Sequence, residues 1–171
     1  MQLLRALKIN LRVKVKRIMK ISIENVKKLR QKTGAGIADC RKALDEAGGD
    51  FKKAQELLKS WGSAIAEKKK DRAVGAGLVE TYIHGGGKVG AMVEVNCETD
   101  FVARTDDFKN LAHEVAMQVA AMDPADVGEL SKQEYIRDSS KKIDDLVKEV
   151  IAKVGENIAV KRFIRFELGG E

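Results

Sequence analysis

Apolar residues between positions 20 and 62 recur at helical spacing in three short blocks. Intervals of three and four residues place the members of each block on one face of a helix. Glycines at 34, 36, 48 and 49 separate the blocks, and Ser22 and Asp50 stand where N-caps are expected. The pattern predicts a three-helix bundle over residues 20–62. Its apolar stripes are Ile23, Val26 and Leu29, then Ile37, Cys40, Ala43, Leu44 and Ala47, and finally Phe51, Ala54, Leu57, Leu58 and Trp61.

Residues 63–77 are polar and charged, which is typical of a solvated helical connector. The apolar period then changes from 3.6 to 2, and two β-rich runs, 78–84 and 88–97, flank three consecutive glycines. This arrangement predicts a β-hairpin with residues 85–87 at its tip. A third strand is predicted near the C-terminus, although Arg162 interrupts its alternation. Its expected apolar face is Ile158, Val160, Ile164, Phe166 and Leu168, and its expected polar face is Lys161, Arg165 and Glu167.

Two longer amphipathic segments, 106–122 and 143–154, lie between the predicted strands. The first is followed by Asp123-Pro124 and the second by Gly155, which are typical helix terminators. The fold class predicted for the whole chain is therefore α+β. A bundle that resembles ubiquitin-associated domains in size and in its glycine-marked first turn precedes a core domain of dimerisation type, residues 78–171. In that domain a three-stranded antiparallel sheet is expected to carry helices on one face.

The net charge of +6 is concentrated at the N-terminus. Residues 1–20 contain seven Lys or Arg and no acidic residue, so the rest of the chain has a net charge of −1. Nucleic-acid binding needs an excess of positive charge, so no direct contact with nucleic acid is expected from the folded part. Residues 1–19 are predicted to be a disordered basic extension. It is interpreted as an organelle-targeting segment, a basic arm, or sequence upstream of a true start at Met19, of which we favour the last. No run approaches a membrane span.

The sequence offers no reaction centre. Cys40 and Cys97 lack CxxC spacing and a His partner, which indicates two buried, reduced thiols in an intracellular protein. His84 precedes three glycines and Lys88, but a strand follows where a phosphate loop needs a helix, and no G-x-S-x-G accompanies an oxyanion motif. His113 has no Cys or His at metal-ligand spacing. We therefore expect a binding protein, with no enzymatic activity, no metal site and no cofactor.

Three stretches are not explained by the patterns of helices and strands alone. They read TGAGIADCRKAL at 33–44, NCETDFVA at 96–103 and KVGENI at 153–158. In this order they resemble the three signature blocks of the elongation factor Ts family. The likeness extends over about residues 21–108 and 143–168, and the second block alone is a long, specific string.

The resemblance implies a partner and a mechanism. Members of this family bind elongation factor Tu, GDP-bound or nucleotide-free, and act as guanine-nucleotide exchange factors that promote GDP release during protein synthesis. Their second block is held to dislodge Mg²⁺ from the partner's nucleotide site, with Phe101 as a wedge between helices of the GTPase domain. The site residues carried over are Thr99, Asp100, Phe101 and Val102 for Mg²⁺ dislocation, Val154 and Gly155 for contact with the same partner surface, and Arg30, Ile37, Ala38 and Arg41 for docking of the bundle. The family's usual methionine pair is Ile37-Ala38 here, which offers a smaller contact surface.

Longer members of the family carry a second sheet subdomain and a helical hairpin before the terminus. Here the sheet motif occurs once, and only about 20 residues separate Met122 from Ile143. The chain thus resembles a one-subdomain form, in which a homodimer supplies the second half. A cytoplasmic location is expected, or a mitochondrion or chloroplast if residues 1–18 are a targeting segment. Two other functions stay open: a ubiquitin-like or polypeptide-binding adaptor that uses the bundle, and a ribosome- or RNA-associated protein that uses the basic arm.

Overall fold

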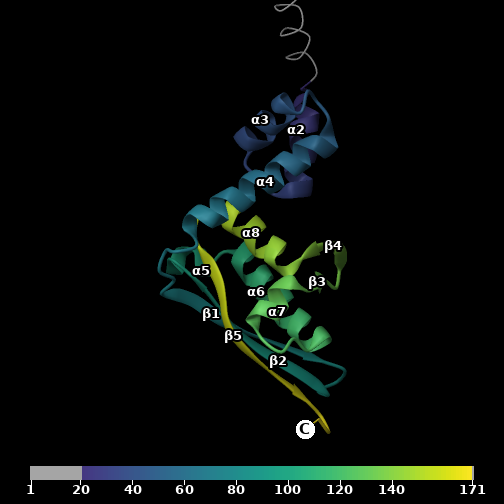
Figure 1. The fold of residues 1–171 in the computed structure, drawn as a ribbon, viewed down its shortest axis with the longest axis vertical. Helices are drawn as coiled ribbons and strands as arrows, with labels where there is room; N and C mark the ends of the chain where they lie inside the picture. The colour runs from purple at the N-terminus through teal and green to yellow at the C-terminus, as the bar shows by residue number, and fades with distance from the viewer. Residues whose placement is uncertain (1–20, 171) are drawn as a thin grey trace, which may run out of the picture. The chain divides into compact units, whose positions relative to one another are not determined.

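The computed structural model describes residues 21–170 and divides the chain into two compact units, which meet between Trp61 and Gly62 (Figure 1). The first unit is helical and the second combines helices with a sheet. The basic extension predicted at residues 1–19 lies outside the described residues. The α+β class predicted from the sequence is confirmed for the described part of the chain.

The helices of the first unit begin where the sequence indicates, and the first two also end there. They are α2 (Ile23–Thr33), α3 (Ile37–Glu46) and the N-terminal part of α4 (Phe51–Lys69). The Ser22 hydroxyl accepts the N–H of Asn25 at 3.0 Å. Gly34 ends α2 in the left-handed conformation, with φ +69°. The Asp50 carboxylate accepts two N–H groups at the start of α4, at 3.0 and 3.1 Å. The predicted N-caps at Ser22 and Asp50 are therefore confirmed.

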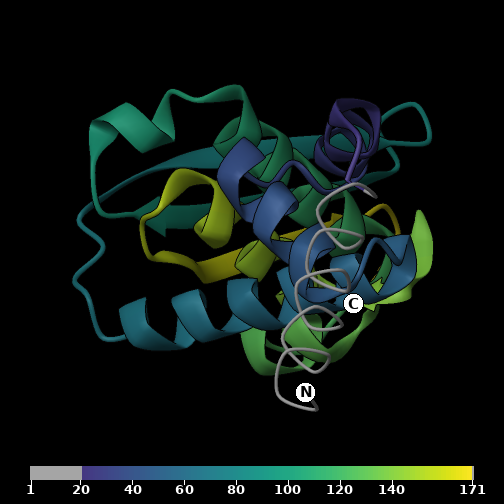
Figure 2. The ribbon, with the colours of Figure 1, turned by 90° about the horizontal axis from the view of Figure 1, so that it is seen from above.

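A small apolar core holds the first unit together. Its fully buried members are Leu29, Cys40, Ala43, Leu44 and Ala54, all on the predicted helix stripes. The larger rings of Phe51 and Trp61 pack against this core from α4. Helix α4 continues without interruption to Lys69, as Figure 2 also shows, so the first part of the predicted polar connector is its C-terminal end.

The second unit is built on a three-stranded antiparallel sheet with the strand order β1-β2-β5 (Figure 1). The strands are β1 (Ala76–His84), β2 (Val89–Cys97) and β5 (Ile158–Glu167). His84 pairs with Val89, and the three glycines between them all have positive φ, so the predicted hairpin is confirmed. On the other side of β2, Cys97 pairs with Ile158. The C-terminal strand thus lies beside the central strand, and β1 and β5 form the two edges of this sheet.

Helices cover one face of the sheet. Helix α6 (Asp106–Met122) lies on β1 and β2, and α8 (Ile143–Val154) packs beside it, both with the predicted bounds. Val93 and Val95 of β2 are fully buried against the fully buried Phe108 and Val115 of α6. The connections hold α5 (Asp100–Ala103), α7 (Val127–Lys132) and the short hairpin of β3 (Glu134–Tyr135) and β4 (Asp138–Lys142). The sequence did not predict α7 or this hairpin, because elements so short show no periodicity.

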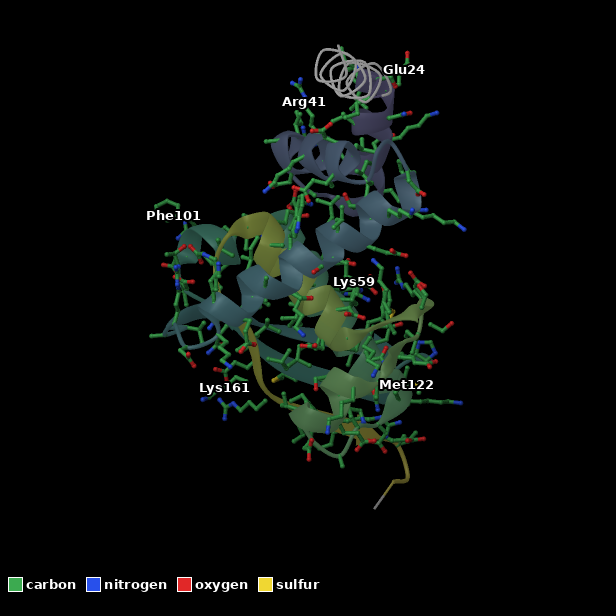
Figure 3. All side chains as sticks on the ribbon, turned by 45° about the horizontal axis from the view of Figure 1, so that its top comes forward. Glu24, Arg41, Lys59, Phe101, Met122 and Lys161 are labelled. Carbon is green, nitrogen blue, oxygen red and sulfur yellow. The ribbon has the colours of Figure 1, made fainter. Side chains whose placement is uncertain are left out.

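One extra residue changes the register of β5. Glu94 pairs with Arg162, whereas its neighbour Val95 pairs with Val160, so Lys161 has no partner on β2. This is a β-bulge, which inserts one residue into a strand and reverses the alternation of side chains beyond it. Figure 3 shows Lys161 projecting away from the ribbon.

The bulge makes the predicted apolar face of the last strand wrong beyond Val160. Phe163 packs against the core, and Arg165 turns toward the helices, where its Nε donates to the carbonyl of Ala120 at 3.1 Å. Ile164 and Phe166, which were expected on the core face, are instead 49% and 68% exposed. The alternation of apolar and polar residues predicts the faces of a strand correctly only as far as the first break in its register.

The face of the sheet away from the helices carries an apolar surface, to which the reversal adds the residues of β5 and the residue after it. Its members are Val79, Ile83, Met92, Ile164, Phe166 and Leu168, which we call the outer sheet patch. The patch is continuous across the strands, because Met92 pairs with Ile164, while Gly90 pairs with both Ile83 and Phe166. Side chains opposite one another on neighbouring strands lie in contact range.

We expect Gly77→Ala to destabilise the second unit by about 3 kcal/mol or more. Gly77 has φ +149°, and a Cβ there would lie 2.2 Å from the carbonyl oxygen of Val95. Gly75→Ala is the matched control, because a Cβ at Gly75 meets nothing within 4 Å. Urea unfolding followed by circular dichroism measures both variants. Equal stability of the two would contradict the close approach of β1 to β2.

Candidate functional site

The segment that carries residues 99–102 leaves the central strand and makes a single helical turn. Helix α5 has four residues, with Thr99 at its N-cap in an extended conformation. The carbonyl of Thr99 accepts the N–H of Ala103 at 3.2 Å, and Thr105 N donates to Val102 O at 3.0 Å. Thr105 then caps α6 by accepting the N–H of Phe108 at 3.3 Å. The turn is thus fixed between β2 and α6.

Adjacent side chains of this turn have opposite environments. Val102 is only 8% exposed and belongs to the core of the second unit. Phe101, the residue before it, is 86% exposed, and Asp100 is exposed beside it. Figure 3 shows the Phe101 ring pointing away from the ribbon. The ring therefore does not fill the local core, a task that Val102 performs.

Two crossed sets of hydrogen bonds tie the exit of β2 to the joint between α8 and β5. The Glu156 carboxylate accepts the N–H of Thr99 at 3.0 Å and its hydroxyl at 2.6 Å. In the opposite sense, the Glu98 carboxylate accepts the N–H of Asn157 at 2.6 Å. Hydrogen bonds to a charged acceptor are stronger than neutral ones. We call Glu98, Thr99, Glu156 and Asn157 the carboxylate bracket.

The electrostatics around the bracket favour the charged form of Glu98 and the neutral form of the Cys97 thiol. The hydrogen bond from the Asn157 N–H holds the pKa of Glu98 below its usual value, and the Arg72 guanidinium, 3.4 Å from the Glu98 carboxylate, lowers it further. Burial raises the pKa of the Cys97 thiol, and the nearby Glu156 carboxylate raises it further. Cys97 donates through Sγ to the carbonyl of Thr99 at 3.2 Å. As the sequence indicated, Cys40 and Cys97 are both buried and free of disulfide bonds.

The predicted partner-binding residues Val154 and Gly155 lie at the same end of the sheet as the turn of residues 99–102. Val154 ends α8 and is partly buried against the core, so it offers only part of its surface to a partner. Gly155 is exposed and adopts the left-handed conformation, with φ +77°. Its carbonyl accepts a hydrogen bond from the ammonium group of Lys69. The bracket connects the two predicted segments through the residues that follow Gly155.

The predicted docking residues of the bundle are all on the surface of the first unit. Arg30 lies near the end of α2, and Ile37, Ala38 and Arg41 lie in the first half of α3, all four exposed. Ile37 is 58% exposed, which is high for a large apolar side chain, and Figure 3 shows Arg41 projecting from the helix. The first half of α3 thus combines apolar and positive groups.

The two histidines considered in the sequence each contact a polar group of the second unit. Within residues 21–170, no group of three or more His, Cys, Asp or Glu side chains could hold a metal ion. His84 contacts the Tyr82 hydroxyl at 3.2 Å, and His113 contacts the Glu80 carboxylate at 3.3 Å on the surface. Over the same described residues, no helix is both long and apolar enough to cross a membrane.

Sequence reasoning missed the residues that hold the turn in place. Glu98 and Glu156 belong to the motif blocks at 96–103 and 153–158, yet neither was predicted as a site residue, and Asn157 and Arg72 were also not singled out. Asn157 is 6% exposed, and its side-chain amide donates to the carbonyls of Lys70 at 3.2 Å and Arg72 at 2.9 Å. The available signal was the polar triplet Gly-Glu-Asn at a helix-to-strand joint, where unpaired backbone groups need partners.

The chain is similar to known proteins over most of its length. A family model described as "Elongation factor TS" matches residues 98–171. The protein named Elongation factor Ts from Coprothermobacter proteolyticus is 47% identical over 196 aligned positions, which cover 88% of this chain and 100% of that protein. Proteins of the same name from Thermotoga petrophila and Thermoanaerobacter sp. are 45% and 43% identical over 194 positions, covering 88% and 87% of this chain and 98% and 95% of theirs. Because these alignments are longer than 171 residues, the relatives contain residues without a counterpart here.

We expect Phe101→Ala to change the free energy of unfolding by no more than about 0.5 kcal/mol, because the ring is 86% exposed. Phe108→Ala is the matched comparison. That ring is fully buried, and its loss should cost about 3–5 kcal/mol. Thermal and urea unfolding of the two variants measure the difference. A large loss of stability in Phe101→Ala would mean that the ring packs within its own domain.

Proposed function

This chain belongs to the elongation factor Ts family, and on that premise we propose that it is a guanine-nucleotide exchange factor for elongation factor Tu. It binds the GDP-bound partner, promotes release of GDP and leaves the nucleotide-free complex. It acts by binding, without a reaction of its own, and it acts in the cytoplasm, where its partner works. The observation that carries the proposal is the exposed ring of Phe101 on a fixed turn.

The mechanism depends on a rigid apolar group that enters the partner. An aromatic ring offers a large contact area with few rotatable bonds, which suits an interface anchor. Phe101 enters the GTPase domain, and the resulting shift displaces the Mg²⁺ of the nucleotide site. Mg²⁺ requires nearly ideal octahedral geometry, so a small shift of its ligands weakens its binding strongly. Loss of the ion exposes the phosphates to unfavourable electrostatics, and GDP leaves.

Thermodynamic coupling makes a reactive side chain unnecessary. If the factor weakens GDP binding, GDP must weaken binding of the factor by the same ratio. The factor then dissociates when a new nucleotide binds, and it can act again. Asp100 and Thr99, exposed beside the ring, and Gly155, on the neighbouring joint, form the rest of this contact.

A second contact is proposed for the bundle. Ile37 and Ala38 meet an apolar surface on a separate helix of the partner's GTPase domain, while Arg30 and Arg41 contact acidic groups around it. Exposed arginines beside an exposed apolar residue are a common composition for binding surfaces. This contact contributes affinity, whereas the Phe101 turn acts on the nucleotide site.

The chain is further proposed to act as a homodimer through the outer sheet patch. One face of the sheet is covered by the chain's own helices, and the opposite face exposes six large apolar side chains. Contiguous apolar surface of this kind marks an interaction site. A second copy of the chain is the occupant we infer, because the described residues 21–170 carry the three-stranded sheet once, where longer family members carry such a sheet twice.

Charge at the border of the patch fits a twofold arrangement. Glu94 and Arg162 form an ion pair at 2.6 Å on the same outer face as Met92 and Ile164. Since this border holds both signs, a twofold axis through the apolar rows can bring Arg162 of one copy toward Glu94 of the other. Sheet-on-sheet packing of this kind buries both patches in one interface.

GDP release from elongation factor Tu, followed with a fluorescent nucleotide, tests the proposed activity. Phe101→Ala is expected to lower the maximal stimulated rate about 30-fold, as loss of an interface hot spot would. Ile136→Ala is the control, because Ile136 is a partly exposed apolar residue on the turn between β3 and β4. It should stimulate release like the parent chain. Parent-like stimulation by Phe101→Ala would contradict the wedge.

Sedimentation equilibrium at micromolar concentration tests the homodimer. The parent chain is expected at twice the mass of one chain, and Phe166→Glu should weaken association about 100-fold because it places a charge in the buried patch. Ile136→Glu is the matched control and should remain dimeric. A parent chain that sediments as a monomer would rule out a second copy as the occupant.

A further inference from the structure

We propose that Glu156 is a positioning residue that holds the turn of Phe101 in the orientation in which it meets the partner. This inference rests on the exchange function proposed above. It assigns a role to a side chain that lies outside the residues carried over from the family resemblance.

Helix α5 cannot hold its own orientation. A single turn of four residues is far below the length at which a helix is stable alone. Its N-cap residue, Thr99, makes no side-chain bond to the helix. The Thr99 hydroxyl and N–H donate instead to the two carboxylate oxygens of Glu156, at 2.6 and 3.0 Å. Two bonds to one planar group fix both the position and the direction of the chain as it enters the turn.

Glu156 is itself held by its neighbours on both sides. Asn157 is 6% exposed and bonds to Glu98 through its N–H and to two backbone carbonyls through its side chain. On the other side, the carbonyl of Gly155 accepts the Lys69 ammonium group. The carboxylate of Glu156 therefore extends from a fixed stretch of backbone.

The buried half of the turn cannot replace this bracket. Val102 and Ala103 are each 8% exposed and anchor the C-terminal side of α5 in the core. The N-terminal side, from Thr99 to Phe101, is exposed, and outside the bracket it is held through backbone carbonyls, which accept from Cys97 Sγ and from the N–H groups of Ala103 and Arg104. Without Glu156 this side samples several orientations, and ordering it in the complex then lowers the affinity.

The geometry also separates this role from direct contact with the partner. Each carboxylate oxygen of Glu156 accepts one donor of Thr99, so the carboxylate is directed at the turn. Loss of the bracket should therefore mainly raise the concentration of factor needed for half-maximal stimulation. Loss of Phe101 should instead lower the maximal rate.

Hydrogen exchange of the free protein tests the inference without the partner. In Glu156→Ala, exchange of the Thr99 and Ala103 amide protons should be about tenfold faster. The Thr99 amide loses its bond to a charged acceptor, and the Ala103 amide bonds to the carbonyl of the residue that has been released. Glu156→Gln should give an intermediate change, since one acceptor oxygen remains. The Val93 amide, in the centre of the sheet, should be unchanged in both. The control Glu134→Ala removes an exposed carboxylate from β3 and should change none of these rates. Unchanged rates at Thr99 and Ala103 in Glu156→Ala would overturn the inference.

A double-mutant cycle in GDP release gives the second readout. Glu156→Ala alone should raise the half-maximal factor concentration about tenfold and change the maximal rate less than about twofold. In the Phe101→Ala background, Glu156→Ala should raise the half-maximal concentration by less than about twofold, because there is no ring left to position. An equal increase in the half-maximal concentration in both backgrounds would contradict the inference, because Glu156 would then act on the partner itself.

The two parts of the experiment separate the inference from the function on which it rests. If the parent chain does not stimulate GDP release, the proposed function fails. The exchange rates of the Thr99 and Ala103 amide protons still decide whether Glu156 holds the turn.

Discussion

The pairing of β5 with the central strand β2 is the constraint on which the second unit depends. It aligns Cys97 with Ile158, so that the exit of one strand and the entry of the other lie at the same end of the sheet. Thr99 and Glu156, 57 positions apart in the chain, can then bond at 2.6 and 3.0 Å. The two motif blocks are neighbours in space because a long-range strand pairing closes the domain, at an entropic cost that the buried core must offset.

The same pairing separates apolar side chains that form the core from those that stay exposed. Helices α6 and α8 fill one face of the sheet, so Val93 and Val95 are fully buried. Phe101 and the outer sheet patch remain exposed because no further element of the described chain covers them. A folded domain tolerates such exposed groups when its core is already complete, and their usual meaning is recognition.

A single bulge residue decides which apolar groups belong to which set. Lys161 has no partner on β2, and beyond it the alternation of β5 is reversed. Ile164 and Phe166 therefore lie on the outer face. Arg165 instead turns toward the helices, where its guanidinium donates hydrogen bonds to the carbonyl of Ala120 and the carboxylate of Glu167. A change of one residue in strand length thus determines the composition of two surfaces.

The sequence by itself determined the longer helices and the strands of the main sheet, and the ends that carry a local signal, because helix periodicity, N-caps such as Ser22 and glycine breaks such as Gly34 act within a few residues of one another. It also carried the three motif blocks that indicate the family. Only the tertiary structure decided the register beyond Lys161, the exposure of Phe101 beside the buried Val102, and the bonds between Thr99 and Glu156. Each of these depends on contacts between segments far apart in the chain, and local pattern holds no information about which distant backbone groups will meet.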